Sequence, residues 1–169
     1  MACGNLIRLN QMPLLKTFIN LCLLRAQPQD LPAAPALTAA TLVAYTLVGL
    51  GLSLPVLGFG RAALWAVLDT LVIAVLTHSA LRMRHFPERL QQTLTALLGS
   101  GALIGLVAWP IIGTENSVIQ LALLLWNLSI VAHILRHALS VPLGLGIIVS
   151  FGYFLVELTV AMVLAPAQS

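Results

Sequence analysis

Long runs of apolar residues alternate with short polar segments along this chain. The runs cover about residues 37–57, 62–81, 93–113, 118–137 and 141–164. A helix needs about 20 mainly apolar residues to cross the hydrocarbon core of a membrane. Lipid offers no hydrogen bonds, so the backbone of a single pass must be helical. The pattern predicts an all-α polytopic membrane bundle with five transmembrane helices in a domain over residues 37–169.

The polar segments between these runs contain residues that end helices. Pro55 and Gly58 lie where the first run ends, and Pro110 and Gly113 close the third. The only dense charge run, residues 82–89, must lie in water. Proline is tolerated in the first turn of a helix, so Pro142 suits the start of the fifth. The connections are too short to hold a soluble domain.

Residues 1–36 precede the first run and are expected to form a separate cytoplasmic segment. An amphipathic helix is predicted over about residues 12–25, with one apolar face made by Leu15, Phe18, Ile19 and Cys22. Such a helix would lie in the membrane interface. The Pro-rich residues 27–35 then predict a stiff, extended linker, which would equally suit docking of a partner.

Composition strengthens the membrane assignment. Of the 169 residues, 60% are hydrophobic and only 8% are Asp, Glu, Lys or Arg, against about 25% charged residues in soluble domains. These values exclude a disordered tail, a disulfide-stapled secreted fold and an ordinary cytosolic enzyme. The net charge of +3 is attributed to basic residues that set the orientation of the chain in the membrane, and no nucleic-acid partner is expected.

The basic residues indicate how the chain is oriented. Five spans would place seven of the eight on one side of the membrane: Arg8, Lys16, Arg25, Arg82, Arg84, Arg89 and Arg136. Only Arg61 falls on the other side. The positive-inside rule then places the N-terminus in the cytoplasm and the C-terminus outside. A bacterial inner membrane is the expected location.

Three polar residues lie well inside the predicted spans. Asp69 and Glu157 are each about seven residues from the outer end of their span, and Asn127 is near the middle of the fourth. Two carboxyl groups brought together in low dielectric would share a proton, because joint ionisation is penalised. These residues indicate either a proton or cation site or polar contacts between helices or subunits.

Three histidines form a second group near the predicted cytoplasmic side: His78, His133 and His137. Histidines on two antiparallel helices can hold a b-type haem through imidazole nitrogens. A metal ion and ordinary interfacial histidines are the alternatives. No HExxH or GxSxG motif occurs, so no catalytic residue is assigned and enzymatic activity is not expected.

Small residues predict where helices approach closely. Gly101 and Gly105 form a GxxxG face on the third span, and Gly144 is one of several small residues on the fifth. Such faces allow close backbone contact between helices in lipid. They can serve packing within the bundle or a seam between two copies of the chain.

Two stretches resemble the Yip-domain family of small polytopic membrane proteins. One is Gln91-Gln92-Thr93-Leu94-Thr95-Ala96-Leu97, entering the third span, and the other is Leu125-Trp126-Asn127-Leu128-Ser129-Ile130. The Asp-Leu-Tyr-Gly-Pro type stretch of that family is not present, and Asp30-Leu31-Pro32 comes closest to it. The resemblance implies a non-enzymatic membrane organiser.

Three classes of function follow from these features. The first is a non-enzymatic organiser or accessory subunit, with lipid and other membrane subunits or a second copy as partners. The second is a haem b-binding redox subunit that uses paired histidines. The third is a proton-coupled transporter or channel built on Asp69 and Glu157.

Overall fold

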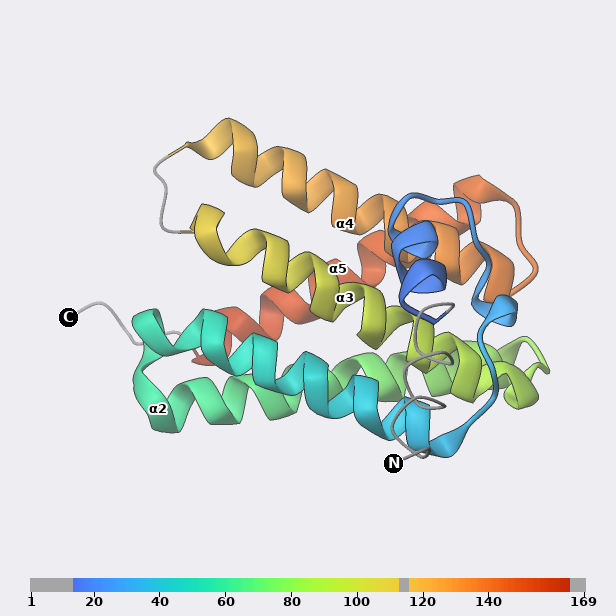
Figure 1. Cartoon of the computed structure of the whole chain (residues 1–169), viewed down its shortest axis with the longest axis horizontal. Helices are drawn as coiled ribbons and strands as arrows, with labels where there is room; N and C mark the ends of the chain where they lie inside the picture. The colour runs from blue at the N-terminus through green and yellow to red at the C-terminus, as the bar shows by residue number, and fades with distance from the viewer. Residues whose placement is uncertain (1–13, 113–115, 165–169) are drawn as a thin grey trace, which may run out of the picture.

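The computed structural model describes residues 14–112 and 116–164, and every long element among them is a helix (Figure 1). The elements are a helix over residues 14–22, α2 (Pro35–Met83), α3 (Leu90–Ile112), α4 (Ser117–Ala138) and α5 (Leu143–Leu164), with short 3-10 turns at Pro28–Asp30 and Pro87–Arg89. Within the described residues, α2 and three further helices are long and apolar enough to cross a membrane. The chain is therefore an all-helical protein with the character of an integral membrane protein.

The 49-residue α2 is a hairpin of two helices that meet at Gly58. Gly58 has φ 69° and ψ 165°, a backbone conformation that is essentially restricted to glycine. The chain reverses there, and the two arms then lie side by side: Thr46 on the first arm, residues 35–57, is hydrogen-bonded to Thr70 on the second, residues 59–83. Pro55 lies inside the first arm, which continues past it to the turn.

The two ends of the bundle hold different connections between the helices (Figure 1). The end that holds the α2 turn and the C-terminal end of α5 is called the Gly58 end. The end that holds the connections from α2 to α3 and from α4 to α5 is called the Arg89 end. The described basic residues Lys16, Arg25, Arg82, Arg84, Arg89 and Arg136 belong to the N-terminal segment or to elements at the Arg89 end, whereas Arg61 follows the Gly58 turn.

The first arm of α2 and α3 run in the same direction, in close contact along their length. Thr38 on the first arm is hydrogen-bonded to Thr95 on α3. Further along, Gly105 lies against Val48, and the Trp109 ring covers Gly51. In the antiparallel pair α4 and α5, the Ser150 hydroxyl donates to the carbonyl of Leu128.

Three helices end in the same way, without a glycine. Leu24, His85 and Ser140 have φ of 60°, 61° and 52°. At Ser140 the two bonds of a Schellman motif are present: Ser140 N–H donates to the His137 carbonyl and Val141 N–H to the Arg136 carbonyl. The same pattern ends the helices before Leu24 and His85. These turns reverse the chain sharply where apolar helices must return into the bundle.

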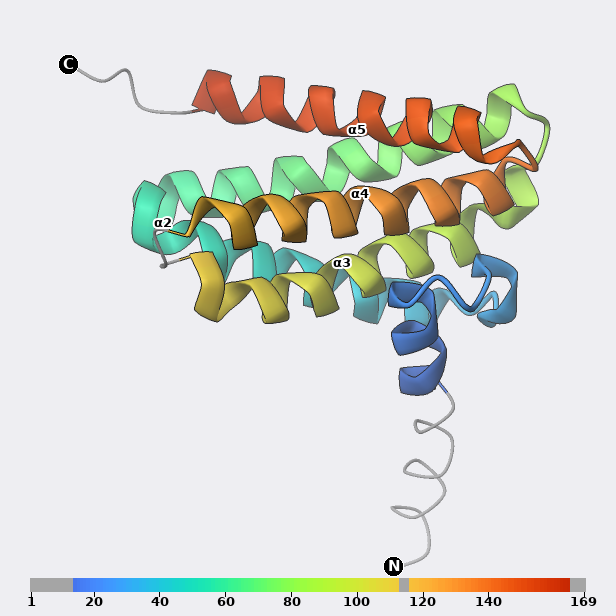
Figure 2. The same ribbon diagram turned by 90° about the horizontal axis from the view of Figure 1, so that it is seen from above.

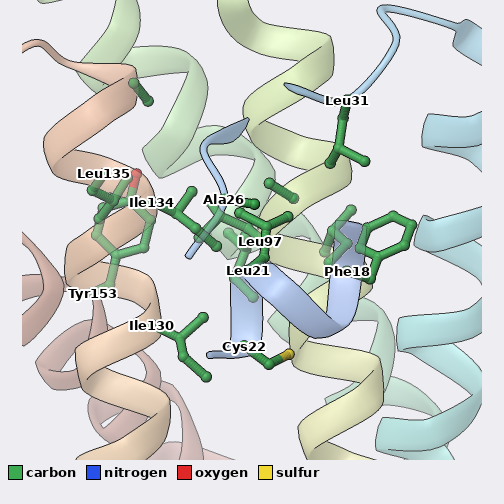
Figure 3. Close-up of a cluster of buried hydrophobic side chains, with 14 of the residues drawn as sticks. Phe18, Leu21, Cys22, Ala26, Leu31, Leu97, Ile130, Ile134, Leu135 and Tyr153 are labelled. Carbon is green, nitrogen blue, oxygen red and sulfur yellow. The ribbon is translucent and has the colours of Figure 1, made fainter. Parts of the chain in front are cut away.

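The helix over residues 14–22 packs against the bundle and stands out from its side (Figure 2). Phe18, Leu21 and Cys22 are buried among side chains of α3 and α4 (Figure 3). Of the apolar face predicted from the sequence, Phe18 and Cys22 pack against the bundle, whereas Leu15 and Ile19 are 55% and 46% exposed. The helix is apolar on two sides, and tertiary packing selects Leu21 in place of Ile19.

The chain that follows this helix is docked onto the bundle rather than extended. Pro28–Asp30 form a 3-10 turn, in which the Asp30 carboxylate accepts from the Gln27 N–H at 2.7 Å. Side chains of the bundle satisfy carbonyl groups of this segment: Trp126 Nε1 donates to Cys22 and Gln92 Nε2 donates to Leu31, both at 2.9 Å. The segment predicted to be a stiff, extended linker or a docking strip thus packs on the bundle of its own chain.

The glycine turn generates a first prediction. Gly58→Ala places a Cβ on a backbone that L-residues avoid, so the free energy of unfolding should fall by about 1–3 kcal/mol. Gly60→Ala is the matched control, because Gly60 lies near the same turn without a positive φ and has open space around it. Unfolding of the detergent-solubilised chain by denaturant measures both. Equal effects of the two substitutions would contradict the account of the turn.

The docked segment generates a second prediction. Burial raises the pKa of the Cys22 thiol, so less of the reactive thiolate is present and modification should be slow. Trp126→Phe leaves the Cys22 carbonyl without its donor, which should loosen the segment and raise the rate of maleimide labelling several-fold in a Cys3→Ala background. Trp109→Phe, far from this segment, is the control. An unchanged rate in Trp126→Phe would show that the indole does not hold the segment in place.

Candidate functional site: a polar core at the centre of the bundle

Polar side chains from four helical segments meet in the middle of the bundle. The Tyr45 hydroxyl on the first arm donates to Asp69 Oδ2 on the second arm at 2.8 Å. Asn127 of α4 and Glu157 of α5 complete the group, since Asn127 lines one cavity with Asp69 and an adjoining one with Glu157. The three residues predicted from the sequence are therefore brought together. We call Tyr45, Asp69, Asn127 and Glu157 the polar core.

Two cavities adjoin the polar core. The larger, ≈ 330 Å³, is lined by both arms of α2 and by α3 and α4, and it extends from Tyr45 and Asp69 toward Ser53 and Trp65 near the Gly58 turn. The smaller, ≈ 50 Å³, holds Glu157 and is lined by all five long helical segments. Tyr45, Gly101 and Asn127 line both cavities. These three residues therefore lie where the two cavities adjoin.

Gly101 makes room for the tyrosine that divides the cavities. A Cβ on Gly101 would lie 2.6 Å from Cε2 of the Tyr45 ring, closer than atoms in contact can approach. The absence of a side chain at this position lets α3 and the first arm approach and lets the ring lie between them. The GxxxG pair Gly101 and Gly105 thus serves packing within the bundle, as one of the two predicted alternatives had it.

Other polar groups beside the polar core are satisfied within the protein. The Tyr153 hydroxyl donates to Thr77 Oγ1 at 3.3 Å, in a contact that is buried between α5 and the second arm. The Thr70 hydroxyl donates to the carbonyl of Ala66 on its own helix. In contrast, Asn127 and Glu157 side chains make no hydrogen bond within the described residues, and both face the cavities. Asn127 and Glu157 are therefore left free to bind water or a solute, and both side chains line the cavities.

The predicted histidine group is only partly assembled. His133 and His137 meet in an edge-to-face contact with ring centroids 4.7 Å apart, and His133 Nε2 lies 3.0 Å from the Ala26 carbonyl. His78 is exposed on the second arm, whereas α4 packs mainly against α3 and α5. The structure does not place His78 beside the pair. Among the described residues, no group of three His, Cys, Asp or Glu side chains is arranged to hold a metal ion.

The packing role predicted for Gly144 within the bundle is wrong. Nothing in the structure lies within 4 Å of a Cβ built on Gly144, and the same holds for Gly152 two turns further along α5. Gly146, between them, is the glycine of α5 that packs: its Cβ would lie 2.8 Å from the carbonyl oxygen of Ala132. The helix is rotated so that Gly146 and Ser150 face α4, whereas Gly144 and Gly152 face outward.

Sequence reasoning missed the aromatic members of the site. Tyr45 and Tyr153 are the only tyrosines in the chain, and both lie inside apolar runs beside the acidic groups. Trp65 lines the larger cavity close to the Gly58 turn. The signal is present in the sequence, because a hydroxyl within an apolar span needs a partner, and each tyrosine lies in the same bundle as an intramembrane acidic residue.

Comparison with protein-family models, with curated proteins and with solved structures gives no match for this chain. The resemblance to Yip-domain proteins therefore rests on the quoted stretches alone, and the function must be argued from the geometry of the polar core.

The division of the cavities by Tyr45 generates a third prediction. Gly101→Ala must displace the Tyr45 ring or separate α3 from the first arm, so the free energy of unfolding should fall by about 1–3 kcal/mol. Gly144→Ala fills open space and should change it by less than about 0.5 kcal/mol. Denaturant unfolding of both variants in the same detergent is the measurement. A Gly144→Ala loss as large as that of Gly101→Ala would contradict the assigned packing.

Proposed function

We propose that this chain is an integral membrane protein that moves protons, alone or coupled to a solute, through the polar core. The observation that carries the proposal is the convergence of Asp69, Asn127 and Glu157, from three separate helical segments, on two adjoining cavities. Ionisable groups inside a membrane are costly, and they are typical of proton relays and ion pathways. Polar contacts that served only to join helices would be expected to satisfy one another, yet two of these three side chains make no such bond.

The path we propose follows the order of the groups. A proton or solute would enter the larger cavity from the Gly58 end and reach Asp69, which Tyr45 contacts. Passage to Glu157 would require the Tyr45 ring to move, because that ring lines both cavities. Two carboxyl groups that interact in low dielectric favour holding one proton between them. The arrangement thus supports stepwise transfer rather than an open pore.

The proposed topology has five spans, with each arm of α2 crossing the membrane once. The arms have 23 and 25 residues as counted from their bounds on either side of Gly58, and about 20 suffice to cross. The excess of basic residues then favours the Arg89 end as the cytoplasmic one, with the N-terminus inside and the C-terminus outside. The bacterial inner membrane remains the location we propose.

An accessory role within a larger membrane complex is the second candidate function. It is favoured by the outward face of α5, where Gly144 and Gly152 leave the backbone uncovered and Ile148 between them is 66% exposed. Such a face allows close approach of a helix from another subunit or a second copy. An organiser role of the kind that the Yip-domain resemblance implies would use this surface, and it is compatible with a working polar core.

The acidic residues generate a fourth prediction. In liposomes that contain the purified chain and a pH-sensitive dye inside, an imposed potential should drive proton movement. Asp69→Asn and Glu157→Gln each remove a proton-carrying group while keeping the side-chain shape, so either should slow that movement at least about tenfold. Glu88→Gln, in the exposed turn Pro87–Arg89 at the Arg89 end, is the control. Movement that is unaffected by both substitutions would remove the proton-coupled function.

A further inference from the structure

The lining of the larger cavity combines acidic, aromatic and aliphatic side chains, a combination that the binding of an inorganic ion does not require. Its lining includes one carboxylate, Asp69, and two aromatic side chains, Tyr45 and Trp65. Aliphatic walls are supplied by Val48, Leu52 and Ile104, and neither lysine nor arginine lines it. The cavity therefore has a negative pole, π faces and an apolar wall.

Neither Ca²⁺ nor Mg²⁺ fits this lining. Ca²⁺ takes six to eight oxygen ligands and Mg²⁺ demands octahedral coordination. The cavity offers the Asp69 carboxylate, the Asn127 amide and the Ser53 hydroxyl, and that hydroxyl already donates to the Gly49 carbonyl at 2.7 Å. The described residues hold no cluster of three acidic, histidine or cysteine side chains for a metal.

An organic cation matches each of these features. An ammonium group is attracted to aromatic faces and needs few direct oxygen ligands. Asp69 supplies the counter-charge, because only its Oδ2 is engaged by Tyr45 and the other oxygen receives no bond within the described residues. A volume of ≈ 330 Å³ lies at the small end of the range for ligand pockets, roughly 300–1,000 Å³.

We infer that the larger cavity binds a small organic ammonium ion with an apolar body, held by Asp69 and by the rings of Trp65 and Tyr45. This inference rests on the proposed function, since it names the class of solute whose movement the proton would drive. The cation and the proton would compete for one carboxylate. The groups that share the cavity with Asp69 include Tyr45 from the first arm and the uncharged Asn127 from α4, and Glu157 from α5 lines the adjoining smaller cavity.

Equilibrium binding of radiolabelled benzyltrimethylammonium to the full chain in detergent tests the inference. Saturable binding is expected, and neopentylbenzene, the neutral carbon analogue, should not displace the label. Asp69→Asn should weaken binding at least tenfold. Trp65→Leu should weaken it about three- to thirty-fold, and Trp65→Phe should restore most of the loss, since a phenyl ring keeps a π face.

Glu88→Gln, at the opposite end of the bundle, is the control variant and should bind as the unmodified chain does. Trp65→Leu keeps the test valid if Asp69→Asn fails to fold. The absence of saturable binding, equal displacement by neopentylbenzene, or full binding in both Asp69→Asn and Trp65→Leu would overturn the inference.

The outcome is separable from that of the proposed function. Proton movement that depends on Asp69 and Glu157, in a chain that binds no benzyltrimethylammonium, would overturn only the inferred solute. Binding with the expected pattern, in a chain that moves no protons, would overturn the proposed transport and support the cation site.

Discussion

A single constraint governs this protein: within lipid, each backbone and side-chain polar group must find its partner inside the chain. The helices meet it for their own backbones, and several hydroxyls of the bundle donate to a carbonyl one turn earlier, as Thr41 and Ser100 do. The irregular segment that precedes α2 lies outside the helices long enough to cross a membrane. Side chains of the bundle hold it in place, because Trp126 donates to the Cys22 carbonyl and Gln92 donates to the Leu31 carbonyl.

The same constraint makes polar groups without a hydrogen-bond partner candidates for a functional role. Tyr153 and Ser150 line the smaller cavity with their hydrogen bonds made, Tyr153 to Thr77 and Ser150 to the Leu128 carbonyl. Asn127 and Glu157 face the cavities with theirs open. Close contact between α3 and the first arm, which Gly101 permits, places the Tyr45 ring where the two cavities adjoin. The absence of a side chain at Gly101 thus accounts both for the close helix packing and for the position of the Tyr45 ring in the polar core.

Much of the fold could be predicted because the lengths of apolar runs report helices directly. The helices lie within a few residues of the expected ranges, and Gly58 reverses the chain where glycine and proline weaken the first run. The similar depth of Asp69 and Glu157 in their predicted spans could be predicted, whereas the packing of their helices around one polar core could not. Depth is encoded in sequence position, so it can be read without a structure.

Rotation of helices about their axes and docking of irregular segments could not be predicted. A helix that is apolar all round has no periodic pattern that indicates which face packs. The sequence therefore could not predict that Gly146, and not Gly144, packs against α4. The choice between Ile19 and Leu21 depends on where α3 and α4 lie. The carbonyl groups to which Trp126 and Gln92 donate hydrogen bonds are more than 60 residues away in sequence. No local sequence pattern predicts such long-range hydrogen bonds.

The central claim is that a polar cavity opens toward the Gly58 end of a bundle whose α2 arms each cross the membrane. Single cysteines introduced in a chain lacking Cys3 and Cys22 test it most directly, with a membrane-impermeant thiol reagent applied to one side of sealed vesicles. Ser53→Cys, which lines the cavity, should react from the side opposite to Arg84→Cys, and Leu47→Cys, 60% exposed on the outward face of the same arm, should not react. Ser53→Cys as unreactive as Leu47→Cys, or reactive from the same side as Arg84→Cys, would contradict the account.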